Sequence, residues 1–154
     1  MTNYRIKKTD HIDQTIRISF KFNGKTYFGF KGDTLASALL SNGIHLIGRS
    51  FKYHRPRGIM SCGNEEPNAI CQINGNTDLT EPNVRATEIE IYEGLEASSQ
   101  NCWPNVKFDI GGINNFISPF IPAGFYYKTF MWPASLWENV YEYFIRKAAG
   151  LGKS

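Results

Sequence analysis

A basic stretch broken by glycine and proline, residues 48–58, constrains the fold of this chain more than any other feature. It is too long and too often interrupted to be a helix or a strand, and it therefore predicts a long loop. A helix pattern precedes this basic loop and a strand pattern follows it. Four Lys or Arg side chains and one His lie within nine of its residues: Arg49, Lys52, His54, Arg55 and Arg57.

Residues 17–30 carry the pattern of a β-hairpin. Apolar and polar side chains alternate over residues 17–22, as they do along a half-buried strand. Asn23 and Gly24 follow, and both tolerate the positive φ angles of a tight two-residue turn. Residues 25–30 are then expected to form the returning strand.

A helix and further strands are predicted after the hairpin. Asp33 or Thr34 can cap the first turn of the helix, and Gly43 stands where a left-handed residue would end it. Strand patterns follow at residues 69–73 and 85–92. A hairpin crossed by one helix and joined by later strands is the plan of a β-grasp domain, so the predicted fold class is α+β.

The chain divides into three predicted parts. Residues 1–15 are polar and of mixed charge, and they are expected to form an arm that lies on another surface. The β-grasp domain is assigned to residues 16–95. Residues 96–154 are an irregular, aromatic-rich extension that either wraps the core or provides an interface, and we expect a mixture, with residues 125–133 mainly interfacial. Apolar residues at helical spacing predict a terminal helix over residues 135–149.

Charge is distributed unevenly along the chain. The net charge is +8 over residues 1–60, −7 over residues 61–100 and +2 over residues 101–154, which leaves +3 for the whole. A chain whose segments neutralise one another in this way is not expected to bind nucleic acid. It has no secretory signal and no apolar run near the ~20 residues of a membrane helix, so a cytoplasmic protein with free thiols is expected.

The three cysteines do not match the ligand pattern of an iron–sulfur site. A ferredoxin-type [2Fe–2S] site needs four thiolates, three of them spaced Cys-x4-Cys-x2-Cys on the loop after the helix. No register of that pattern on Cys62 or Cys71 includes a second cysteine, and the cysteines and histidines show no zinc spacing either. No metal site and no catalytic residue is predicted, because nothing in the sequence places a cysteine beside His54.

Two interpretations of the basic loop remain open. Its charges are either solvated and paired with the acidic segment 61–100, including Glu65 and Glu66, or docked on an anionic partner. Such a partner is a neighbouring subunit or a dinucleotide phosphate, to which Arg side chains bind well. The candidate cofactor-binding residues of the second interpretation are Arg49, Lys52, Arg55 and Arg57.

Five blocks of the sequence resemble a known family, at residues 32–40, 48–58, 65–69, 81–87 and 122–133. The blocks include the unusual runs Arg-Ser-Phe-Lys-Tyr-His-Arg-Pro-Arg and Gly-Phe-Tyr-Tyr-Lys-Thr-Phe-Met-Trp-Pro. Nearly the whole chain is similar to the N-terminal region of the α subunit of heterotetrameric sarcosine oxidase. In that family this region resembles a [2Fe–2S] ferredoxin-like β-grasp domain that has lost its cluster cysteines, in agreement with the cysteine spacing above.

The resemblance implies a place in a flavoenzyme complex that oxidatively demethylates sarcosine to glycine. In that family the α subunit continues into a dinucleotide-binding domain that holds NAD and ends in a domain that binds tetrahydrofolate. The flavoprotein β subunit holds FAD, and FMN lies near the α/β boundary.

This chain stops where the dinucleotide-binding domain would begin, so we expect a truncated or split α subunit that binds no cofactor and is inactive alone. The implied function is that of a structural module for assembly of the complex. The alternatives are a [2Fe–2S] electron-transfer domain and an adaptor of another amine- or amino-acid-oxidising flavoprotein.

Overall fold

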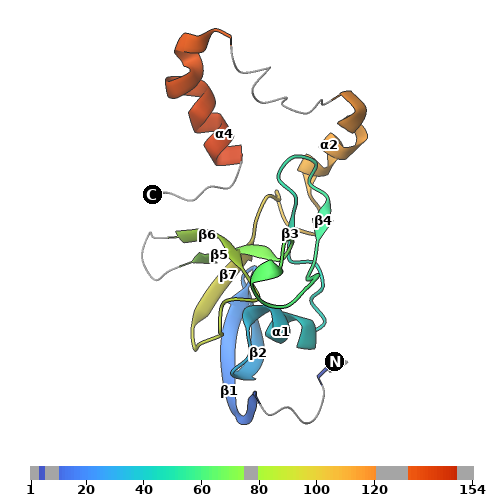
Figure 1. The fold of residues 1–154 in the computed structure, drawn as a ribbon, viewed down its shortest axis with the longest axis vertical. Helices are drawn as coiled ribbons and strands as arrows, with labels where there is room; N and C mark the ends of the chain where they lie inside the picture. Colours follow the sequence, from blue (N-terminus) through green and yellow to red (C-terminus); the bar gives the residue numbers. More distant parts are fainter. Residues whose placement is uncertain (1–3, 6–10, 75–79, 121–131, 149–154) are drawn as a thin grey trace.

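A computed structural model of the chain describes residues 4–5, 11–74, 80–120 and 132–148. Five strands form one mixed sheet in the order β2-β1-β7-β5-β6, and helix α1 (Leu35–Ser41) packs beside it (Figure 1). The strands are β1 (Asp13–Phe22), β2 (Lys25–Lys31), β5 (Ile70–Asn74), β6 (Thr80–Arg85) and β7 (Leu95–Ser99). A hairpin, one helix and a return strand parallel to β1 define a β-grasp sheet, so the predicted α+β class is confirmed.

β1 and β2 form the predicted hairpin. Asn23 and Gly24 turn the chain with φ angles of 51° and 73°, which is the conformation that this pair of residues favours. Asn23 also holds β7, because its side-chain amide donates to Ser99 Oγ (2.9 Å) and its Oδ1 accepts from the Ser99 amide (2.8 Å). β1 begins at Asp13, so the sheet reaches into residues 1–15, the predicted arm.

Thr34 is the residue that caps α1. Its hydroxyl oxygen accepts a hydrogen bond from the Ser37 amide (3.2 Å), and Gly43 follows the helix with a φ angle of 74°. Asp33, the other predicted cap, is buried and binds Arg5 through both carboxylate oxygens, at 3.0 and 2.6 Å. The described start of the chain is therefore fastened beside the start of α1.

The hydrophobic core lies between α1 and the sheet. Its largest fully buried members include residues of β1 (Phe20 and Phe22), α1 (Leu35 and Leu39) and β7 (Leu95). Burying an apolar side chain of this size contributes about 1.5–3 kcal/mol relative to leaving it exposed. These side chains therefore decide which face of the sheet receives the helix.

The strand predicted over residues 85–92 is wrong beyond its first residue. Residues 86–88 form a turn, and Glu90 makes only an isolated bridge. The alternating pattern that suggested a strand arises because Ile89 and Ile91 face the core while their neighbours face outward. The strand of this region, β6, lies earlier in the chain.

β7 follows that turn and occupies the centre of the sheet. It is parallel to β1, with Phe20 opposite Leu95, and antiparallel to β5, with Ile73 opposite Ala97. The strand extends beyond residue 95, where the sequence analysis ends the β-grasp domain. β7 has only five residues and two buried apolar side chains. The alternation of apolar and polar residues is therefore too short to predict this strand from the sequence.

The basic loop contains a short ladder that the sequence analysis missed. β3 (Gly48–Arg49) pairs antiparallel with β4 (Pro56–Arg57), with Gly48 opposite Arg57. The expectation of no strand in this stretch is therefore wrong. Each strand has only two residues, so alternation of side chains gives no signal.

Several short helices lie in the rest of the described chain, among loops and turns. They are η1 (Gly63–Glu65), η2 (Ile110–Gly112), α2 (Ile113–Phe116), η3 (Ser118–Phe120), η4 (Ala134–Leu136), η5 (Trp137–Tyr141) and α4 (Glu142–Ala148). The last three confirm the predicted terminal helix as far as residue 148. Most of the segment 125–133, predicted to be interfacial, lies outside the described residues. In the described ranges, no helix is both long and apolar enough to cross a membrane.

Candidate functional site

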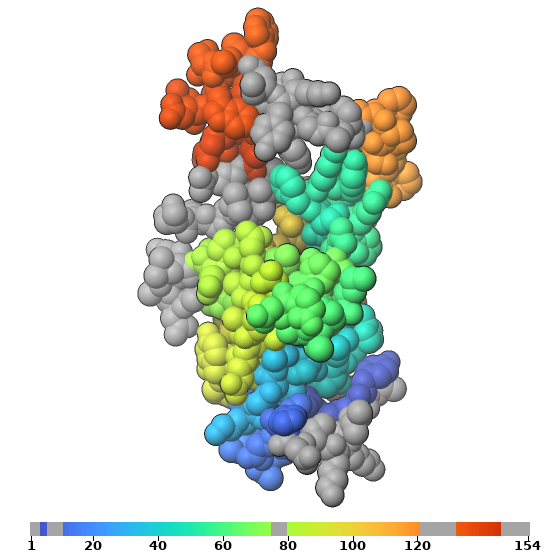
Figure 2. All heavy atoms as spheres, in the orientation of Figure 1, coloured from blue at the N-terminus to red at the C-terminus, as the bar shows by residue number. Residues whose placement is uncertain are grey.

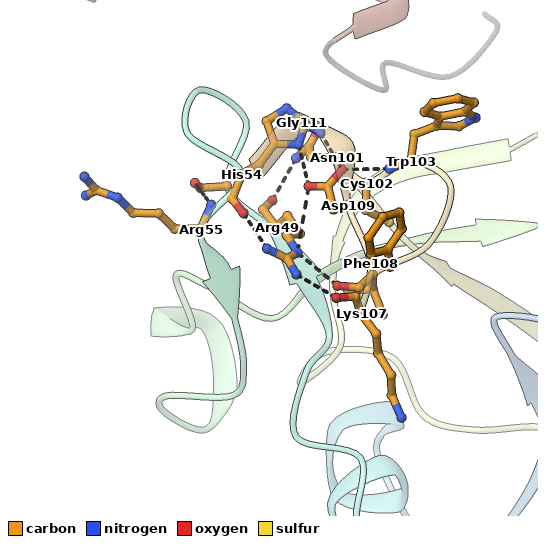
Figure 3. Close-up of polar contacts among 12 residues, drawn as sticks. Arg49, His54, Arg55, Asn101, Cys102, Trp103, Lys107, Phe108, Asp109 and Gly111 are labelled. Atoms are coloured by element: carbon orange, nitrogen blue, oxygen red, sulfur yellow. Dashed lines mark hydrogen bonds and ion pairs between the residues drawn. The ribbon is translucent and has the colours of Figure 1, made fainter. Parts of the chain in front are cut away.

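Arg49, on β3, points into the molecule and not toward solvent (Figure 3). Its Nε donates to the Val106 carbonyl (2.9 Å), its Nη1 to the His54 carbonyl (2.9 Å) and its Nη2 to the Lys107 carbonyl (3.3 Å). The side chain is 13% exposed. All three guanidinium nitrogens are thus engaged within the chain, and they fasten the basic loop to the segment that follows β7.

Asp109 is the buried anion beside Arg49. Its Oδ2 lies 2.8 Å from His54 Nδ1 and 3.8 Å from Arg49 Nε, while its Oδ1 accepts from the amides of Trp103 (2.9 Å) and Gly111 (3.1 Å). A fully buried carboxylate is costly unless cations and hydrogen-bond donors surround it, and this one has both. Asp109 therefore closes the basic loop onto residues 103–111 (Figure 3).

Lys52 and Arg55 lie together at one aromatic ring. The Tyr53 ring centroid is 5.0 Å from Lys52 Nζ and 4.8 Å from the Arg55 guanidinium carbon. Arg55 is exposed, and its Nε donates to Asn115 Oδ1 (2.9 Å). The structure thus brings two of the four candidate cofactor-binding residues together at the end of the basic loop.

Arg57 points away from that pair, toward the loop before β5. Its Nη1 donates to Asn68 Oδ1 at 2.6 Å. Glu66 lies in the loop before β5, together with Asn68. The sequence suggested Glu66 as an ion-pair partner of the basic loop, but its carboxylate binds backbone amides. Its carboxylate accepts four backbone hydrogen bonds, from the amides of Met60, Ser61, Asn68 and Ala69.

The segment 103–120 exposes many large apolar side chains, and we call it the apolar surface. Its most exposed members are Trp103 (68%), Phe108 (66%), Ile113 (62%), Phe116 (83%) and Phe120 (84%). In Figure 1, α2 lies beyond the β3–β4 ladder and away from the sheet, and in Figure 2 it forms a projecting edge, drawn in orange. Exposed apolar clusters of this kind mark interaction sites.

The apolar surface and the basic loop form one continuous region. Asn114 Nδ2 donates to the Lys52 carbonyl (3.3 Å), and Asn115 accepts from Arg55. The cationic end of the loop is therefore held directly beside the exposed side chains of α2.

Comparison with known proteins identifies the fold family. Residues 15–102 match the model of a 2Fe-2S iron-sulfur cluster binding domain. The chain belongs to that family. The matched residues include the basic loop and all five strands of the sheet except the first two residues of β1, and the match ends after β7.

The chain is also similar to sarcosine oxidase α subunits, and to one of them over its whole length. The chain is 59% identical over its whole length to sarcosine oxidase subunit alpha of Rhizobium meliloti (strain 1021), of which it spans 16%. It is 37% identical to sarcosine oxidase subunit alpha of Corynebacterium sp. (strain U-96) over 56% of this chain and 9% of that one. A solved L-proline dehydrogenase from P. horikoshii aligns with a TM-score of 0.44 and 24% identity, over 55% of this chain and 15% of that one. The resemblance to sarcosine oxidase α subunits is confirmed, and the chain spans less than a fifth of their length.

The residues present do not fit the cluster for which this 2Fe-2S family is named. Cys62 is exposed on the loop before β5, Cys71 is buried in the core and Cys102 lies beyond β7. Burial raises the pKa of the Cys71 thiol to about 12, whereas iron binds the thiolate. No group of three or more His, Cys, Asp or Glu side chains suited to a metal ion occurs in the part of the chain that the structure describes.

The sequence did not predict that two carboxylates, those of Asp109 and Glu66, hold this region together. Asp109 carries no local signal, because its partners His54 and Arg49 lie more than fifty residues away in sequence. Glu66 had a weak signal, since an acidic residue beside proline in a loop between a helix and a strand is available to bind backbone amides.

Proposed function

We propose that this chain is a structural module of a sarcosine oxidase α subunit, and that it serves assembly of the complex. The 59% identity to a sarcosine oxidase subunit alpha along the whole chain carries this proposal. The role of the module is to present the apolar surface to other parts of the oxidase. We assign no catalytic step to the chain's own residues, and sarcosine oxidation belongs to the assembled cytoplasmic enzyme.

The size of the relatives supports the assembly role. The chain spans 16% of the Rhizobium meliloti subunit, so most of such a subunit lies outside this domain. Aromatic side chains at the centre of an interface contribute most to binding, and several are exposed here. In the proposed complex the partners are the rest of the α subunit and a flavoprotein β subunit, with FAD, FMN, NAD and tetrahydrofolate bound outside this chain.

The basic loop has a second role in this proposal. Lys52, Arg55 and Arg57 contact a cofactor phosphate or an acidic edge of a partner, to which Arg and Lys bind with charge-assisted hydrogen bonds. Arg49 holds the loop in place, because its guanidinium is engaged by three carbonyls of the chain.

The test is the sarcosine-dependent oxygen consumption that co-purifies with a tagged chain from its native cells. The double variant Phe116→Asp, Phe120→Asp places two charges on the apolar surface and is expected to lower the co-purifying activity at least about tenfold. The control is Tyr92→Asp, which changes a residue that is 54% exposed outside the apolar surface. Full activity with the double variant, or none with the unmodified chain, would contradict the proposal.

A further inference from the structure

The loop from Met60 to Ala69 is built around one buried carboxylate, that of Glu66. Its Oε2 accepts from the amides of Met60 (2.7 Å) and Ser61 (2.6 Å), and its Oε1 accepts from those of Asn68 (2.7 Å) and Ala69 (3.0 Å). Glu66 is 0% exposed. Because two donors come from each end of the loop, the carboxylate joins the two ends across its centre.

Backbone amides stabilise this charge, and among the described residues no cationic side chain forms an ion pair with it. Burial of the carboxylate acts to raise the pKa of Glu66, but the hydrogen bonds from Ser61, Asn68, Met60 and Ala69 outweigh it and hold the pKa below its usual value. The nearest guanidinium contact that the structure records, Arg85 Nε at 3.2 Å, is to the Glu66 carbonyl oxygen. A concave array of N–H groups of this kind binds anions, and such arrays recur at phosphate and iron–sulfur sites.

The outer side of the loop is held by other residues. Arg85 binds the Glu66 carbonyl, Thr87 Oγ1 donates to the Gly63 carbonyl (2.7 Å), and Arg57 binds Asn68. These contacts fix the loop to β4, to the last residue of β6 and to the turn that follows it. The four amides therefore point toward one place, which the Glu66 carboxylate fills.

We propose that the loop 60–69 is an anion site that the chain fills with its own Glu66 carboxylate, and that this internal ligand takes the place of the [2Fe–2S] cluster of the family. The carboxylate uses the inward-pointing amides and neutralises them. The loop consequently keeps its shape without metal or sulfide, and the site is closed to the cluster. This inference rests on the loop geometry and the family match, and it is independent of the proposed partners.

Chemical rescue tests the site. Glu66→Ala removes the carboxylate from the full chain and leaves the four amides facing an empty space of anion size, so we expect its melting temperature to fall by about 5 °C or more. Sodium formate at 100 mM is expected to restore at least half of that loss, relative to the same concentration of sodium chloride. Glu65→Ala is the matched control, because Glu65 is the exposed neighbour with the same charge, and it should show neither loss nor rescue. A loss that formate does not reduce would overturn the anion site.

Glu66→Gln keeps the shape of the side chain. It therefore provides a second test if the alanine variant does not fold. One oxygen remains, but an NH₂ group now faces two amide donors, so two of the four amides should lose their acceptor. Hydrogen exchange is therefore expected to be at least about tenfold faster than in the unmodified chain at one pair of amides, either Met60 and Ser61 or Asn68 and Ala69. Unchanged exchange at all four amides would contradict the proposed role of the charge.

Reconstitution tests exclusion of the cluster. The unmodified chain is incubated anaerobically with ferrous iron, sulfide and dithiothreitol, desalted, and examined for visible absorbance and bound iron. We expect no iron–sulfur absorbance bands and less than about one iron atom per ten chains. Two iron atoms and two sulfides bound per chain would overturn the inference even if formate rescue succeeds.

Discussion

Single buried charges, and not the exposed cations of the basic loop, fix the shape of the candidate site. Asp109 contacts His54 and Arg49, which lie more than fifty residues away in sequence. Glu66 accepts hydrogen bonds from amides at both ends of the loop 60–69. The sequence pattern singles out the basic residues but not the directions of their side chains. The direction of a side chain depends on tertiary partners, and local patterns contain no information on these.

The contact between Gly111 and His54 gives a prediction at the scale of one residue. A Cβ added at Gly111 would overlap the His54 ring, which cannot move without losing its 2.8 Å contact to Asp109. We therefore expect Gly111→Ala to lower the free energy of unfolding by about 1–3 kcal/mol, as overpacking does. Urea denaturation measures the change.

Gly112→Ala is the matched control for this prediction. A Cβ at Gly112 meets nothing within 4 Å, so the same methyl group one residue later should change the stability by less than about 0.5 kcal/mol. Equal stabilities of the two variants would show that His54 is not held against Gly111.

A helix or strand of this chain could be predicted from the sequence when the contacts that form it are between residues close together in the sequence. The β1–β2 hairpin and α1 were predictable because Asn23-Gly24, Thr34 and the apolar periodicity are local signals. β7 was not, because its five residues become a strand only through pairing with β1 and β5. The β3–β4 ladder depends likewise on contacts of the basic loop with itself.

Leu95 provides the prediction for the sheet. It is fully buried at the start of β7, opposite Phe20, so Leu95→Ala removes core contacts from the central strand. We expect the free energy of unfolding to fall by about 2–5 kcal/mol. Thermal and urea unfolding followed by circular dichroism measure this loss.

The comparison variant is Ile110→Ala, which truncates an aliphatic side chain that is 51% exposed on the apolar surface. Its unfolding free energy should change by less than about 1 kcal/mol. If both variants lose the same stability, the apolar surface is part of the folding core and is not an interface.

At the scale of the whole molecule, the cationic end of the basic loop lies directly beside the apolar surface. The hydrogen bonds from Asn114 to Lys52 and from Arg55 to Asn115 connect them. The sequence predicts a basic loop and an aromatic-rich extension with its interface mainly at residues 125–133, whereas the apolar surface at residues 103–120 and its place beside the basic loop come from the fold. A face with an apolar centre and cations beside it is suited to a partner with an acidic rim.

The double variant Lys52→Ala, Arg55→Ala tests the basic part of this face in the assembled oxidase, because these two side chains lie together at Tyr53. Loss of two cations should weaken association and reduce the flavin that co-purifies with the tagged chain by about tenfold, more strongly at low salt than at high salt. Flavin absorbance per chain is the measurement. Arg17→Ala is the control, because Arg17 lies on β1 and contacts Phe28 on β2 (3.8 Å from the guanidinium carbon to the ring centroid). Unchanged assembly and flavin content with the double variant would contradict the role proposed for these residues.

The central position of β7 also has a consequence for how the chain folds. β2 and β1 on one side and β5 and β6 on the other are joined in the sheet only through β7, the last of the five strands to leave the ribosome. Until it emerges, two separate hairpins expose unpaired strand edges, and long-range closure of this kind is slow. Nascent chains that end before Leu95 should therefore be the ones that aggregate or engage chaperones, whereas chains that extend past Ser99 can close the sheet.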